Sequence, residues 1–309
     1  MKPFALGLLL LAACQGTPAP PVTQLHPVTS SARLVLDPSH DYGDRYADGV
    51  LPVGDGKYRT TAAKGYVFAC DGYAQRFGTD RGGAGSQGPW FAGATWSSRT
   101  KATVQGSVRW TGRFTTTVSD GTRTITTDDL PTHPTGVFPV QPSDPAFAYD
   151  RNPNTISAQA LTYELPASPT YGSPTCMGGE AGVMLTGVAL FNGFDAGGRD
   201  AGAWEVRDSC GGHPQNTGEY HYHSLSSCIA DVRVSTVIGF ALDGFPITGP
   251  RVGAHNVLTT RDLDECHGIT STVSLDGTSV TTYHYVMTQD FPYSVSCFRG
   301  AATRPPPSG

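Results

Sequence analysis

The stretch that decides the fold class is RFTTTVSDGTRTI, residues 113–125. Its two arms are rich in Thr, and they flank Asp120-Gly121, a pair that favours the tight turn of a β-hairpin. The sequence therefore predicts a hairpin here. Other runs, bounded by Gly, Pro, Asn or Asp, predict further short strands at 65–70, 103–110, 158–163, 182–191, 237–242 and 279–287.

The composition favours the same fold class. Gly (38) and Pro (24) make up about a fifth of the 309 residues, which disfavours long helices, and segments such as 201–207 and 260–266 are expected to hold single helical turns. Hydrophobic residues reach 38%, enough for a core. We therefore expect a mainly β protein: one large β-rich domain with short strands, long loops and few short helices, stapled by disulfides.

The first residues have the pattern of an export signal. Lys2 precedes the apolar run 4–13, which has the length of a signal-peptide core rather than of a membrane span. The run ends in Leu-Ala-Ala-Cys14, which resembles the lipobox of bacterial lipoproteins and implies a lipid-modified Cys14. Ordinary secretion, with Cys14 cut away or left as a free thiol, is the alternative.

These signals predict four segments and a location. We expect a signal peptide at 1–13, the lipidated Cys14 with a flexible tether at 14–31, the β-rich domain at 32–303 and a Pro-rich tail at 304–309. The expected location is the bacterial cell envelope, periplasmic or at the cell surface, with the lipid anchor binding the membrane surface. A net charge of −5 without a Lys/Arg cluster argues against a nucleic-acid partner, and the sequence names no macromolecular partner.

Six cysteines follow the proposed anchor. An even number in an exported protein favours three disulfides over a thiolate metal site, and none of the six forms a C-x-x-C pair. Fifteen pairings are possible. We predict Cys210 with Cys228 and Cys266 with Cys297, because each couple brackets a His/Tyr-rich segment, which leaves Cys70 for Cys176.

The densest polar cluster is DSCGGHPQNTGEYHYHSLSSC, residues 208–228. On a strand, side chains alternate between faces, so His221 and His223 would point one way and Tyr220 and Tyr222 the other. Two imidazoles on one face can share a metal ion, and imidazole suits both zinc and copper. Further ligands must come from elsewhere, and the candidates are His213, His267 and His284.

Carboxylates are expected as hydrogen-bond partners of the ligating histidines, and the candidates are Glu205, Asp243 and Asp264. In an enzymatic version, an open coordination position would activate water, with Asp243 or Glu205 as the base. The alternative is a non-catalytic extracellular binding or scaffold module with buried structural histidines. It would recognise a polymer through exposed aromatic residues such as Trp90, Phe91, Trp96 and Trp110. The residues alone do not decide whether the protein is an enzyme.

Several motifs resemble those of the YHYH domain proteins, a family of bacteria and eukaryotes named after the pattern seen here at 220–223. Similar segments are YVFAC (66–70), PTGVFP (134–139), DRNPN (150–154), VALFN (188–192), DSCGGHPQ (208–215), LDGFPI (242–247), LDECHG (263–268), FPY (291–293) and CFRG (297–300). The resemblance implies export, a single β-rich domain and the importance of His221 and His223, but no particular reaction. The family usually repeats a YHYH-like pattern later, which here is YHYV (283–286), without the second histidine. If the family uses that last histidine as a ligand, the site here is incomplete or differently built; if it uses the first, His284 still serves.

Overall fold

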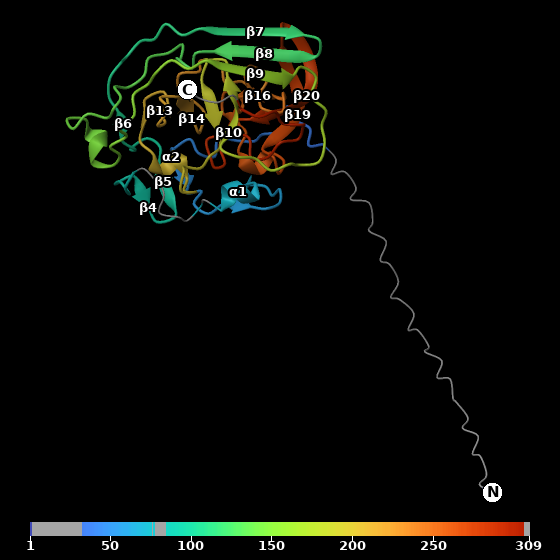
Figure 1. Ribbon diagram of the computed structural model, residues 1–309, viewed down its shortest axis with the longest axis horizontal. Coiled ribbons are helices and arrows are strands. Elements are labelled where there is room, and N and C mark those ends of the chain that lie inside the picture. Colours follow the sequence, from blue (N-terminus) through green and yellow to red (C-terminus); the bar gives the residue numbers. More distant parts are fainter. Residues whose placement is uncertain (2–32, 76, 78–84, 306–309) are drawn as a thin grey trace. The chain divides into compact units, whose positions relative to one another are not determined.

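An eight-stranded mixed sheet organises the chain in the computed structural model, which describes residues 1, 33–75, 77 and 85–305 (Figure 1). The strand order is β13-β14-β11-β10-β15-β16-β20-β19. Neighbours pair antiparallel except for β11 with β14 and β16 with β20, which are parallel. The strands are β10 (Glu180–Met184), β11 (Ala189–Phe191), β13 (Gly212–Pro214), β14 (Tyr220–Tyr222), β15 (Val237–Ala241), β16 (Pro246–Thr248), β19 (Gly268–Leu275) and β20 (Thr278–Val286).

A second sheet contains the hairpin that the sequence predicts. It consists of β7 (Phe114–Ser119), β8 (Thr122–Thr127) and β9 (Leu161–Pro166), which run side by side in Figure 1. Asp120 and Gly121 form the turn with φ of 51° and 77°, the left-handed conformation that a two-residue hairpin loop requires. The hairpin is therefore confirmed.

The remaining elements are short. A three-stranded sheet has the order β1-β5-β4, and three pairs stand alone: β2 with β3, β12 with β6, and β17 with β18. Helices are limited to α1, α2 and two 3₁₀ turns in the described residues, so the mainly β class is confirmed. The bounds are β1 (Val50–Pro52), β2 (Tyr58–Arg59), β3 (Val67–Phe68), β4 (Phe91–Ala92), β5 (Thr95–Ser97), β6 (Thr103–Val104), β12 (Arg207–Asp208), β17 (Arg251–Gly253), β18 (Asn256–Val257), α1 (Asp71–Ala74), α2 (Ala201–Trp204), η1 (Pro145–Ala148) and η2 (Thr260–Asp262).

Glycine explains why the extent of two predicted strands is wrong. The run 182–191 contains parts of two strands, because Gly187 has φ of 92° and lies in the turn between β10 and β11. The run 103–110 forms a strand only over β6, since Gly106, with φ of 119°, breaks the extended conformation. Beyond it, Val108 makes only an isolated bridge to Thr135.

The disulfides pair as predicted. The bonds are Cys70–Cys176, Cys210–Cys228 and Cys266–Cys297, with Cα atoms 4.9, 5.2 and 4.6 Å apart. The second bond encloses both β13 and β14 in one loop.

From Arg33 onward the chain forms one compact unit. No helix among the described residues is long and apolar enough to cross a membrane. Apart from Met1, the predicted signal peptide at 1–13 lies outside the described residues, and so do Cys14 and the tether. Residues 306–309 of the Pro-rich tail also lie outside them.

Candidate metal centre

The hairpin of β13 and β14 brings two histidines together. Its antiparallel register places His213 directly opposite His221. Opposed residues of an antiparallel pair project from the same face, so the two imidazoles are neighbours, with ring centroids 4.5 Å apart. Strand pairing thus places His213 beside His221 directly. Gly212 allows this register, since a Cβ there would lie 2.3 Å from the ring of Tyr220.

His223 follows the last residue of β14 and joins the same group. Its Nε2 lies 3.1 Å from Nε2 of His221. The exposed fractions of His213, His221 and His223 are 5%, 4% and 3%. One nitrogen from each ring falls within a cluster in which all three atoms are within 4.8 Å of one another.

The two tyrosines of the motif point away from this group, as strand alternation predicts. The Tyr220 hydroxyl donates to Asp208 Oδ2 at 2.8 Å. The Tyr222 hydroxyl contacts Nε2 of His133 and donates to Thr186 Oγ1 at 3.2 Å. Both phenols are therefore buried with polar partners, which is what a buried hydroxyl requires.

Glu205 approaches the histidines from α2. Asp200 caps that helix, accepting a hydrogen bond from the Ala203 N–H at 3.2 Å. The Lys101 ammonium donates to the backbone oxygens of Gly202 and Glu205 at 2.6 and 2.5 Å and so holds the end of the helix in place.

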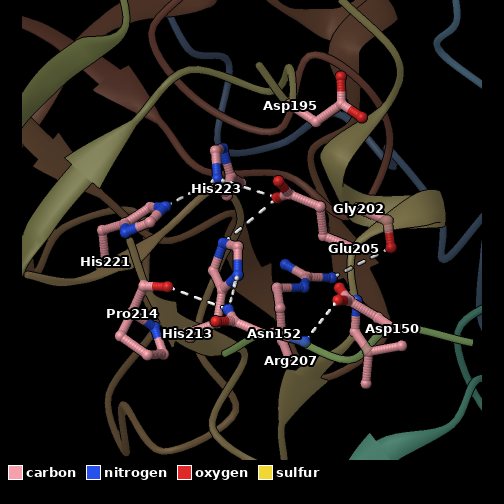
Figure 2. Close-up of polar contacts among 12 residues, drawn as sticks. Asp150, Asn152, Asp195, Gly202, Glu205, Arg207, His213, Pro214, His221 and His223 are labelled. Carbon is pink, nitrogen blue, oxygen red and sulfur yellow. Dashed lines mark hydrogen bonds and ion pairs between the residues drawn. The ribbon is translucent and has the colours of Figure 1, made fainter. Parts of the chain in front are cut away.

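The Glu205 carboxylate lies among the imidazoles. Its Oε2 is 3.3 Å from Nε2 of His213 and 3.2 Å from Nε2 of His223 (Figure 2). Two histidines, one in β13 and one directly after β14, thus meet a carboxylate supplied by the end of a helix.

Backbone carbonyls set the tautomers of two histidines. Nδ1 of His223 lies 2.6 Å from the Asn192 oxygen, and Nδ1 of His221 lies 3.3 Å from the Glu219 oxygen. A carbonyl oxygen only accepts, so each Nδ1 carries the proton and donates it. In a neutral imidazole the other nitrogen is then an acceptor. Nε2 of His221 and Nε2 of His223 therefore face each other as two lone pairs.

Burial keeps these rings neutral. It lowers the pKa of His221 well below the ordinary value, and a positive charge on His213 or His223 would lower it further. Burial likewise lowers the pKa of His223, to about 4. Burial alone would raise the pKa of Glu205, but the neighbouring His213 and His223 outweigh it and hold that pKa below its usual value. At neutral pH two imidazole lone pairs therefore face a carboxylate.

Two buried polar atoms of this cluster lack hydrogen bonds. Oε2 of Glu205 and Nε2 of His213 are buried and have no hydrogen-bond partner of ordinary geometry among the described residues. Unsatisfied buried polar atoms are costly and rare in folded proteins. A tetrahedral ion with bonds of 2.0–2.1 Å would hold its ligand atoms about 3.3 Å apart. The observed separations of 3.1, 3.2 and 3.3 Å are close to that spacing.

The cluster opens into a cleft with a volume of about 1500 Å³. Phe191 forms part of the wall, and its ring stacks on His221 with centroids 4.3 Å apart. Besides the site residues, aromatic and amide side chains line the cleft, among them Tyr149, Asn152, Asn154 and Gln215.

The other two candidate ligands lie elsewhere. His284 contacts Thr248 Oγ1 through Nδ1 at 2.9 Å and Ser271 Oγ through Nε2 at 2.7 Å, so both of its nitrogens have partners. His267 Nε2 contacts Thr288 Oγ1 at 3.0 Å. The structure brings neither into the cluster of His213, His221 and His223 found in the described part of the chain.

Of the three candidate carboxylates, only Glu205 reaches the cluster. Asp243 accepts from the Tyr285 hydroxyl at 2.6 Å, and Asp264 pairs with Arg299 at 3.0 Å. Each is occupied by a partner of its own.

The aromatic residues proposed for polymer binding are largely internal. Trp90 and Trp96 are buried in the core, and Phe91 and Trp110 are half-buried.

Sequence reasoning missed two features of the site. It named Glu205 as a hydrogen-bond partner of the ligating histidines or as a base, but not its position within 3.3 Å of both His213 and His223. It also gave no role to Asn152, whose side-chain amide lies 3.4 Å from Nδ1 of His213. Asn152 falls inside the DRNPN motif at 150–154, a polar segment that could have drawn attention to it.

The model of the family described as YHYH protein matches residues 162–258, from the second residue of β9 to just beyond β18. Neither a curated protein nor a solved structure gives a significant match. The matched segment contains Glu205, His213, His221 and His223. Over residues 162–258 the chain is therefore similar to the YHYH protein family.

Proposed function

We propose that this protein binds one divalent transition-metal ion, zinc or copper, in the cluster of His213, His221, His223 and Glu205. The observation that carries the proposal is the meeting of buried acceptors: two Nε2 lone pairs, 3.1 Å apart, beside a carboxylate oxygen without a hydrogen bond. A bound cation would satisfy all of them at once.

The alternative is a set of buried structural histidines. It would require a proton between His221 and His223, but the lowered pKa of both rings disfavours that proton at neutral pH. The donor types also narrow the choice of ion. Imidazole with a carboxylate suits zinc and copper, whereas calcium and magnesium favour oxygen ligands.

Elemental analysis of the purified protein, before and after reconstitution with zinc or copper, tests the proposal. We expect about one equivalent in the wild type and loss of stoichiometric metal in both His221→Ala and His223→Ala. Tyr222→Phe is the matched control, because its hydroxyl points away from the cluster and contacts Thr186. If the wild type binds no metal after reconstitution, or both alanine variants keep it, the structural-histidine alternative is correct.

We also propose that the protein is exported and anchored by a lipid on Cys14. The three disulfides support an oxidising compartment, and the sequence up to Cys14 supports the anchor. The mature protein should partition into detergent, and Cys14→Ser should lose that behaviour. Unchanged partitioning of the variant would remove the anchor and leave ordinary secretion.

A further inference from the structure

The four side chains of the cluster do not have equivalent surroundings. Nδ1 of His221 and of His223 each faces a carbonyl oxygen, which only accepts. Nδ1 of His213 instead faces the side-chain amide nitrogen of Asn152, at 3.4 Å. An amide nitrogen donates, so His213 has the opposite partner.

The orientation of the Asn152 amide is fixed by two other contacts. Its Nδ2 donates to the Pro214 oxygen at 3.0 Å, and its Oδ1 accepts from the Asn154 N–H at 3.0 Å. Exchanging the oxygen and nitrogen would break both hydrogen bonds. The NH₂ group therefore points at His213, whose Nδ1 must accept.

A neutral imidazole that accepts at Nδ1 carries its proton on Nε2. In His213 that Nε2 lies 3.3 Å from Oε2 of Glu205. A nitrogen that carries a proton has no free lone pair for a metal ion. By contrast, Nε2 of His221 and Nε2 of His223 present lone pairs.

We propose that the ion is held by three protein groups, the Nε2 atoms of His221 and His223 and the carboxylate of Glu205, and that His213 is a positioning residue for Glu205. This inference rests on the proposed function. It leaves the fourth coordination position to a water molecule or to an oxygen atom of a ligand. Two histidines, a carboxylate and an open position make up the ligand set of catalytic rather than structural zinc sites.

The cleft gives such a ligand access. His221, His223 and Glu205 all line it, so the ion would lie at its wall rather than in a closed interior. A cleft of about 1500 Å³ exceeds the space that a drug-sized ligand needs. The ligand class is therefore a molecule that presents a neutral or anionic oxygen to the ion while its remainder lies in the cleft.

X-ray absorption of the zinc-loaded full chain counts imidazole ligands. It therefore distinguishes a site with two ligating histidines from one in which His213 is a third ligand. We expect two imidazoles in the wild type and the same two in His213→Ala. The variant should retain about one equivalent of zinc, with an affinity lower by roughly 10-fold, the usual effect of losing a group that orients a ligand. His213→Gln, which can still donate to Glu205, should recover most of that affinity.

A second measurement tests the open position. Azide added to the cobalt(II)-substituted wild type should change the visible spectrum, because it enters the fourth site. Three imidazoles in the wild type, or a spectrum indifferent to azide, would overturn this inference while leaving the metal site intact. A wild type that binds no zinc or cobalt would refute the proposed function itself, so the two failures are distinguishable.

Discussion

Two Tyr-His-Tyr segments lie in the same sheet, one at 220–222 in β14 and the other at 283–285 in β20. Each segment has a tyrosine with the same kind of partner. Tyr220 donates to Asp208 at 2.8 Å, and Tyr285 donates to Asp243 at 2.6 Å. In both segments a buried phenol is satisfied by a buried carboxylate.

Their histidines differ in the chemistry of their neighbours. His284 lies between the hydroxyls of Thr248 and Ser271, and a hydroxyl can donate or accept as the ring requires. His221 has a carbonyl at one nitrogen and the lone pair of His223 at the other. A shared motif therefore does not make two equivalent sites. The hydrogen-bonding capacity of the neighbours separates a structural histidine from a candidate ligand.

The fourth position of each motif strengthens the contrast. His223 continues the first segment into the cluster, whereas the second segment continues into Val286, which is fully buried in a small apolar cluster with Leu258 and Ile269. In the later segment, the apolar side chain of Val286 therefore stands where the first segment has its second imidazole, and it packs in the core.

The largest expected difference between the segments concerns metal affinity. His221→Ala should lower zinc affinity by more than about 100-fold, the upper range for losing a group that only orients a ligand. His284→Ala should leave affinity unchanged, since its ring is occupied by Thr248 and Ser271. Competition with a chromogenic chelator measures both. Equal losses of zinc affinity in the two variants would show that His221 and His284 do not differ as metal ligands.

Zinc should also stabilise the folded chain through the first segment only. Ligand at 1,000 times its dissociation constant adds about 4 kcal/mol to the free energy of unfolding. We expect thermal unfolding to show this gain in the wild type and in His284→Gln, and no gain in His223→Ala. A gain that persists in His223→Ala would place the zinc elsewhere.

The loss of stability in acid should report on His284 in the second segment. Burial lowers the pKa of His284 to about 4, from an ordinary 6.5. As the pH falls, the unfolded chain therefore binds the proton on His284 before the folded chain does. The contribution of neutral His284 to the free energy of unfolding is complete above pH 6.5 and is lost as the pH falls from 6.5 toward 4. Its full size is about 3 kcal/mol.

Urea unfolding at pH 7 and at pH 4 measures this loss. His284→Gln should be less stable than the wild type at pH 7 and should lose less stability on acidification. A pH dependence identical to that of the wild type would show that His284 does not contribute to it.

The tyrosines should give the smallest effect. Tyr220→Phe and Tyr285→Phe each remove one donor from a carboxylate that keeps backbone donors, such as the Cys210 N–H for Asp208 and the Gly300 N–H for Asp243. We expect each change to cost about 1–2 kcal/mol in the free energy of unfolding. Unequal costs, differing by more than that amount, would show that the two phenols are not equivalent.

The sequence predicted local structure well because local rules determine it. Asp120-Gly121 fixes a hairpin through its own backbone preferences. The disulfide pairs also followed from the positions of cysteines around the His/Tyr-rich segments. The prediction failed over 182–191, where a turn at Gly187 interrupts a continuous apolar run.

The site was only partly predictable for a related reason. The facing of His221 and His223 follows from alternation along one strand. The approach of Glu205 depends on where folding places the residue after α2 relative to the β13–β14 hairpin, and nothing in the spacing of the residues encodes that contact. The isolation of His284 likewise depends on Thr248 from the neighbouring strand β16.

The Cys210–Cys228 bond has a consequence for how the centre assembles. It closes a ring with a sequence separation of 18 that contains His213, His221 and His223 but not Glu205. An oxidised but unfolded chain therefore still carries all three imidazoles on one small covalent macrocycle. In that macrocycle the three imidazoles stay within a short stretch of chain before the sheet forms. Glu205 lies outside the ring, so its carboxylate joins the three imidazoles only when the chain folds.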